Sequence, residues 1–140
     1  MEFNKILVPV IGNEADEEAI KLAYRLLDKK GEICAVCVIT VARDLPLDAE
    51  IKPEINKAEG VLDRVEGIAK EGGCLIETEL LQAREVGPAI VNEAKDREAD
   101  LILMGVKYKR RFGEFSLGDV VPYVLENAQC PVILYHQYTP

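Results

Sequence analysis

The chain has 140 residues, of which 49% are hydrophobic and 30% are charged, and its formal net charge at pH 7 is −8. These values predict one globular domain with a substantial core, and they exclude an intrinsically disordered chain. The negative charge disfavours nonspecific binding to nucleic acid or to an anionic membrane, and no apolar run approaches the roughly 20 residues of a membrane-spanning helix.

The chain begins with a strand that leads through a short turn into a helix. Residues 4–10 (NKILVPV) predict the first strand, which contains a continuous apolar run. Pro9 is expected near the carboxyl end of this strand because proline cannot donate a ladder hydrogen bond. Asn13 then caps a helix that ends before Gly31, with Asp16 as its capping-box partner. Because the strand starts so close to Met1, there is no room for a signal peptide, and we expect a cytoplasmic protein.

A second apolar run, residues 33–40, predicts another strand and contains Cys34 and Cys37. Side chains three residues apart on a strand point to opposite faces, so these two thiols cannot share one metal ion. We therefore expect the cysteines to be small buried hydrophobic residues in a reducing compartment.

The middle of the chain predicts helix, strand and helix in that order. Residues 51–69 have apolar positions at helical spacing. Gly60 and Gly67 within this helix are expected to allow close packing on the sheet; the other reading is a weaker helix. Residues 74–81 form a more polar strand, as an edge strand should be. Residues 85–98 form the third helix.

The last third of the chain carries the segment with most functional information. Residues 101–104 predict a strand buried on both faces, which Gly105 ends. A basic loop follows, containing Lys107, Tyr108, Lys109, Arg110 and Arg111. Gly118 and Asp119 begin a fourth helix, and residues 132–135 form a fifth strand. Loops that leave a parallel strand and enter a helix are common sites for anions and nucleotides.

Two segments of this last third are similar to a known family. Residues 99–105 (ADLILMG) and Cys130-Pro131-Val132 resemble the corresponding strands of the universal stress protein family (UspA-like domains). The resemblance covers essentially the whole chain as one domain. It implies a three-layer α/β/α fold of the adenine nucleotide alpha hydrolase-like type, with a five-stranded parallel sheet in the order 3-2-1-4-5.

The resemblance also implies a nucleotide motif, from which this chain departs. Nucleotide-binding members carry Gly, two residues, Gly, nine residues, then Gly followed by Ser or Thr. Gly105 and Gly118 occupy the outer glycine positions. Tyr108 replaces the middle glycine, Asp119 replaces the hydroxyl residue, and Ile11 stands where the family has an aspartate near the ribose. All three departures weaken the usual ATP-binding mode.

The candidate cleft lies at the switch point between the first and fourth strands. Its predicted residues are Pro9, Val10, Ile11, Val38, Gly105, Lys107, Tyr108, Arg110, Gly118, Asp119 and Val120. If a nucleotide binds, the resemblance implies that the Val38 backbone meets the adenine and that Lys107 or Arg110 supplies positive charge. No catalytic or metal-binding residue is expected, since the single histidine, His136, has no nucleophile at a suggestive spacing.

Two functional hypotheses follow. The first is a dimeric regulatory or protective binding module that does not use ATP in the usual family mode, needs no cofactor and acts on unidentified protein partners. Ile11 and Tyr108 would then fill the cleft. The alternative is a protein that binds ATP or AMP with Mg²⁺ through an altered loop, with slow ATP hydrolysis. This alternative predicts an open cleft.

The resemblance also implies a dimer that forms through the fifth strand, which would otherwise be an apolar sheet edge. The predicted interface residues are Val132, Ile133, Leu134, Tyr135, His136 and Tyr138. The other reading is an edge shielded by the C-terminal tail.

Overall fold

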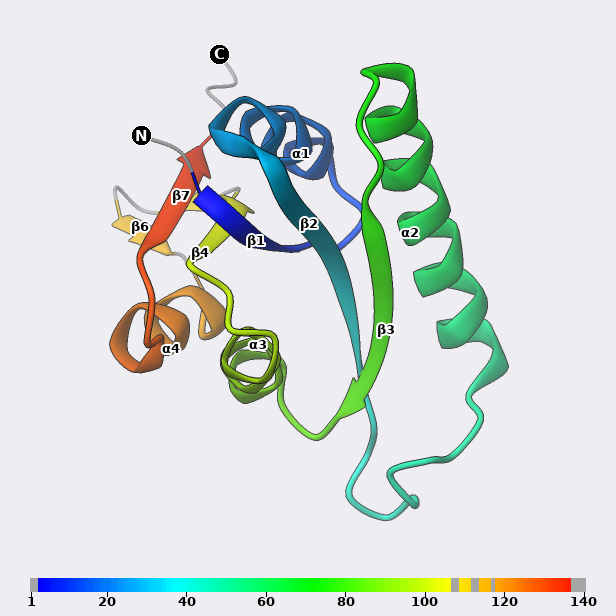
Figure 1. Ribbon diagram of the computed structural model, residues 1–140. Helices are drawn as coiled ribbons and strands as arrows, with labels where there is room; N and C mark the ends of the chain where they lie inside the picture. Colours follow the sequence, from blue (N-terminus) through cyan, green and yellow to red (C-terminus); the bar gives the residue numbers. More distant parts are fainter. Residues whose placement is uncertain (1–2, 107–108, 112–113, 117, 137–140) are drawn as a thin grey trace.

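A five-stranded parallel sheet forms the centre of the computed structural model, which describes residues 3–106, 109–111, 114–116 and 118–136 (Figure 1). The elements, in chain order, are β1 (Phe3–Pro9), α1 (Glu14–Leu26), β2 (Leu27–Thr40), α2 (Lys52–Glu71), β3 (Glu77–Ala83), α3 (Val86–Asp96), β4 (Leu101–Val106), β5 (Lys109–Arg111), β6 (Glu114–Ser116), α4 (Val120–Asn127) and β7 (Val132–His136). The strand order is β3-β2-β1-β4-β7. Because β7 is the fifth strand of this sheet, the predicted order 3-2-1-4-5 is confirmed.

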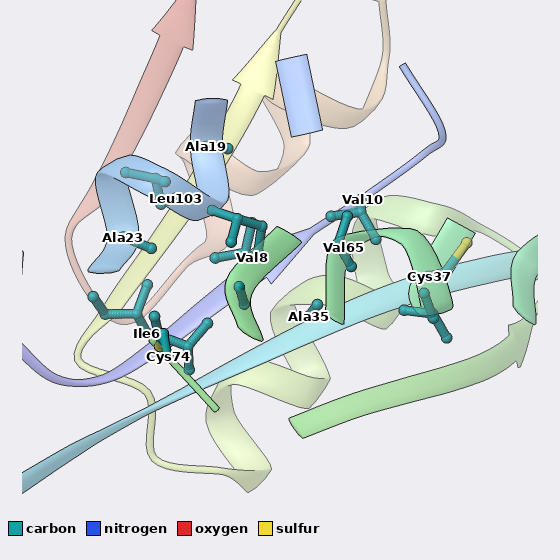
Figure 2. Close-up of a cluster of buried hydrophobic side chains, with 14 of the residues drawn as sticks. Ile6, Val8, Val10, Ala19, Ala23, Ala35, Cys37, Val65, Cys74 and Leu103 are labelled. Carbon is teal, nitrogen blue, oxygen red and sulfur yellow. The ribbon is translucent and has the colours of Figure 1, made fainter. Parts of the chain in front are cut away.

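Two helices cover each face of the sheet, which gives the predicted three layers (Figure 1). On one face, Ile6 and Val8 of β1 pack with buried side chains of α1 and α2, and Figure 2 shows Ala19 and Val65 from these helices in this cluster. On the other face, Leu7 belongs to a second cluster with residues of α3 and α4. Neighbouring residues of β1 thus serve opposite faces, as a strand buried on both sides requires.

The two cysteines of β2 follow the same alternation. Cys37 belongs to the cluster under α1 and α2, whereas Cys34 belongs to the cluster under α3 and α4. The prediction that they point to opposite faces is confirmed. Burial raises the pKa of the Cys34 thiol to about 11, so this group is protonated and unreactive at neutral pH. Cys74 is also buried, and Cys130 is half-buried.

Several predicted boundaries differ from the structure. The second strand begins at Leu27, where it pairs with Phe3 of β1, and not at residue 33. The third strand begins at Glu77 because the Cys74 amide still donates to the carbonyl of Ala69, 2.8 Å away, at the end of α2. The third helix ends at Asp96, since the backbone of Glu98 has a positive φ of 55°.

The expected role of the two glycines in α2 is wrong. A Cβ atom built on Gly60 or Gly67 would meet no atom within 4 Å, so neither residue permits close packing on the sheet. Both lie on the exposed side of the helix, while Leu62 and Val65 provide the buried side.

The predicted basic loop after β4 contains regular structure. β5 and β6 pair as a two-stranded antiparallel ribbon, with Arg110 opposite Phe115. Two short runs separated by two residues, one of them glycine, have the spacing of a tight hairpin. The prediction of a loop is therefore wrong for residues 109–111, which form a strand.

Candidate functional site

The turn between β1 and α1 is organised by the buried carboxylate of Asp16, which is only 3% exposed. This carboxylate accepts hydrogen bonds from the backbone N–H groups of Ile11 (3.2 Å), Gly12 (2.6 Å) and Asn13 (3.1 Å). In return, the Asn13 side chain accepts from the amides of Ala15 and Asp16, which completes the predicted capping box. The amide donors at the start of α1 are therefore used within the turn itself.

Burial and hydrogen bonding act in opposite directions on Asp16. Removal from water raises the pKa of this carboxyl, whereas the amides of Gly12, Ile11 and Asn13 and the charge of Arg64 lower it. The net direction is upward, so desolvation outweighs the hydrogen bonds. The side chain belongs to the framework of the turn and does not line the cleft described next.

A cleft of about 270 Å³ opens at the carboxyl ends of β1 and β4, between the sheet and helices α3 and α4. This is the switch point of the sheet, because the chain leaves β1 toward one face and β4 toward the other. The predicted site residues that line it are Pro9, Val10, Ile11, Val38, Gly105, Gly118, Asp119 and Val120. The structure therefore brings together residues from the first, second and fourth strands and from the start of the last helix.

The side chains of three predicted site residues are not among those that the structure describes. Lys107 and Tyr108 lie outside the described residues. Arg110 belongs to β5, and only its backbone is described.

Ile11 does not fill the cleft, contrary to the first hypothesis. Its side chain borders the cleft but is 66% exposed, since Asp16 holds the Ile11 amide in a turn beyond the end of β1. The cleft is consequently open along this edge. Ile11 presents an apolar side chain where the family has an aspartate.

The sequence did not indicate seven of the residues that line the cleft. The additional lining residues are Asn13, Val36, Val86, Ile90, Met104, Val106 and Val121. Val86 and Ile90 are one helical turn apart on α3, and this spacing is also that of an ordinary core-facing stripe. Cleft-lining residues of α3 can be told from core residues only by the strand order, which places α3 and α4 over the ends of β1 and β4.

Gly105, the first glycine of the family motif, has a packing role in this chain. A Cβ atom at this position would lie 2.5 Å from the backbone oxygen of Ala15 and 2.8 Å from its carbonyl carbon. Such distances are far inside van der Waals contact, so only glycine lets the first turn of α1 approach β4 this closely. The glycine thereby sets the position of the turn that carries Ile11 and Asn13.

Gly118 and Asp119 line the cleft at the start of α4. Gly118 has φ +72°, the left-handed region that favours glycine, and a Cβ atom built there would meet no atom of the described residues within 4 Å. Asp119 is the N-cap residue of α4, but its side chain makes no capping hydrogen bond. The side chain is exposed and borders the cleft.

The predicted interface strand forms one edge of the sheet. β7 pairs with β4 on one side only among the described strands, and Val132, Ile133, Leu134 and Tyr135 are half-buried. His136 is the exposed last residue of the strand, and Tyr138 lies outside the described residues.

The described residues contain neither a metal-binding cluster nor a membrane-spanning helix. No group of three or more His, Cys, Asp or Glu side chains in the described ranges is arranged to hold a metal ion. In the same part of the chain, no helix combines the length and apolar character needed to cross a membrane.

Comparison with known proteins places the chain among relatives along nearly its whole length. A model described as the Universal stress protein family matches residues 2–136. Universal stress protein MJ0531 of Methanocaldococcus jannaschii is 34% identical over 139 residues, which cover 94% of this chain and 81% of that protein.

Solved structures agree with this placement. The universal stress protein of Archaeoglobus fulgidus in complex with dAMP has a TM-score of 0.73 at 22% identity, covering 96% of this chain and 98% of that one. An Arabidopsis thaliana universal stress protein family protein with AMP bound has a TM-score of 0.70 at 16% identity, covering 97% and 93%. At these identities, the likeness to the two structures establishes the fold.

Proposed function

The chain belongs to the universal stress protein family, and from this premise we propose that it is a regulatory binding module whose cleft holds an adenine nucleoside or nucleotide. The observation that carries the proposal is the open cleft of about 270 Å³ at the switch point of the sheet. An open cleft is what the ligand-binding alternative requires. Ile11 leaves the cleft open on its side, and Tyr108, the other residue that the first hypothesis places in the cleft, lies outside the described residues.

The chemistry of the cleft suits the purine part of such a ligand. Val10, Val38 and Met104 offer apolar surface for the faces of a flat ring. The structural relatives that contain dAMP and AMP support a ligand of this class. We propose binding without the usual ATP-hydrolysing mode, and a regulatory output through protein partners.

Calorimetric titration with AMP tests this proposal. We expect saturable binding of AMP by the native chain. We expect Val38→Phe to weaken this binding at least about tenfold, because the phenyl ring would occupy part of the cleft. The matched control is Leu125→Phe, which adds the same ring at an α4 position that is 50% exposed and outside the cleft. If neither AMP nor adenosine binds at millimolar concentration, the proposed function is wrong.

We also propose that the active form is a homodimer joined through β7. The support is the half-buried apolar edge of this strand, which leaves a row of backbone groups for a second copy to cover.

Light scattering after gel filtration measures the assembly directly. The native chain should run at twice the monomer mass, and Tyr135→Glu should shift it to the monomer. Leu75→Glu, which changes a residue 85% exposed before the opposite edge strand, should leave the mass unchanged. A native chain of monomer mass would contradict the dimer while leaving the cleft proposal intact.

A further inference from the structure

We infer that the cleft selects an uncharged purine nucleoside and discriminates against its phosphorylated forms. The inference rests on the proposed function and deepens it by naming the class of ligand. The described residues of the cleft suit the base and the sugar of a nucleotide but not its phosphate group.

The first reason is that the backbone amides of the turn before α1 already have an acceptor. Backbone amides at a helix N-terminus are a common phosphate site, and α1 begins beside the cleft. Here the amides of Ile11, Gly12 and Asn13 already donate to the Asp16 carboxylate at 2.6–3.2 Å. These three amides therefore already have an acceptor and are not available to a phosphate in the cleft.

The second reason is the negative charge of Asp119, which borders the cleft at the start of α4. Its carboxylate is exposed and makes no capping hydrogen bond. A phosphate drawn toward the amides of α4 would meet this carboxylate at close range. The repulsion between two like charges partly exposed to water is large enough to decide between ligands.

The third reason is the composition and size of the cleft. Among its described lining residues there is no lysine, arginine or histidine, and all but a few are aliphatic. Its volume of about 270 Å³ lies just below the range of about 300–1,000 Å³ that is usual for ligand pockets. The space suits a base with its sugar better than a molecule extended by three phosphates.

Titrations of the full chain with adenosine, AMP and ATP, at low and at moderate salt, test the inference. We expect adenosine to bind most tightly, AMP about tenfold more weakly and ATP more weakly still, because each phosphate adds repulsion. Moderate salt should narrow these differences, since it screens exposed charges.

Two variants locate the cause. Asp119→Asn keeps the shape of the side chain and removes its charge, so the ratio of AMP affinity to adenosine affinity should rise about tenfold. Glu126→Gln removes one charge from the exposed part of the same helix, and this ratio should stay within about twofold of the native value.

The outcomes separate the two claims. ATP binding as tight as adenosine binding in the native chain would overturn the inference and leave the proposed function standing. An unchanged ratio in Asp119→Asn would also overturn it, because the discrimination would then have another source. Absence of binding by all three compounds would overturn the proposed function itself.

Discussion

Replacing Gly105 with alanine should lower the free energy of unfolding by about 3 kcal/mol, as expected for overpacking against atoms that cannot move independently. The new methyl group would lie 2.5 Å from the Ala15 carbonyl oxygen, and backbone atoms cannot turn aside as a flexible side chain can. Relief requires α1 to move away from β4. Urea denaturation of the native and variant chains measures the change.

Gly67→Ala is the matched control for this experiment. A Cβ atom at Gly67 meets nothing within 4 Å, so the same substitution should stabilise the chain by about 1 kcal/mol through the better helix propensity of alanine. If Gly105→Ala were as stable as the native chain, the glycine would not be required for packing. Its place in the family motif would then need another explanation.

Replacing Asp16 with alanine should have an effect of similar size. Three backbone N–H groups, those of Ile11, Gly12 and Asn13, would lose their acceptor in a partly buried turn. We expect a loss of about 3 kcal/mol, since donors left without partners cost more than the average hydrogen bond contributes. Asp16→Asn keeps one acceptor oxygen and should lose about half as much.

Glu18→Ala separates this effect from a general loss of acidic charge at the start of α1. The Glu18 side chain is 36% exposed and is 3.9 Å from Lys21, so its removal should change stability by less than about 0.5 kcal/mol. Equal effects of Asp16→Ala and Glu18→Ala would contradict the role of Asp16 as the acceptor of the turn.

The pH dependence of stability should carry the signature of the same carboxyl. Its pKa is raised in the folded chain above the ordinary value of 3.8, so the folded state holds the proton more tightly than the unfolded state. The resulting stabilisation is complete below pH 3.8 and is lost as the pH rises through the raised pKa. Asp16→Asn should remove this part of the acid profile, which unfolding measured across the acid range would detect.

Much of the fold could be predicted from the sequence because its signals are strong and redundant. Continuous apolar runs marked the buried strands, Pro9 marked the end of β1, and the alternation of strands with helices required parallel pairing. The prediction that Gly105 ends the fourth strand is wrong, because Gly105 pairs with Tyr135 and β4 continues to Val106. The family resemblance then supplied the strand order. Boundaries were less certain where hydrogen bonds decide them, as at Cys74, whose amide remains bonded to α2.

The cleft was predicted less completely, for physical reasons. Residues of the β-strand ends were found because topology brings them together, but Val86 and Ile90 have the same spacing as core residues and differ only in what faces them. The exposure of Ile11 depends on the hydrogen bond from its amide to Asp16. No local sequence pattern predicts this bond. A carboxylate at a helix start usually caps it, and Asp119 shows that backbone geometry can leave it unused.

The central claim is that the cleft at the switch point binds an adenosine-type ligand, and an NMR titration of the isotopically labelled chain with adenosine tests it most directly. The predicted result is saturable shifts of the amides that line the cleft, such as those of Val10, Val38 and Val120, with no shift at Leu75, which lies outside it. No shifts at millimolar adenosine, or shifts confined to residues away from the cleft, would contradict the claim.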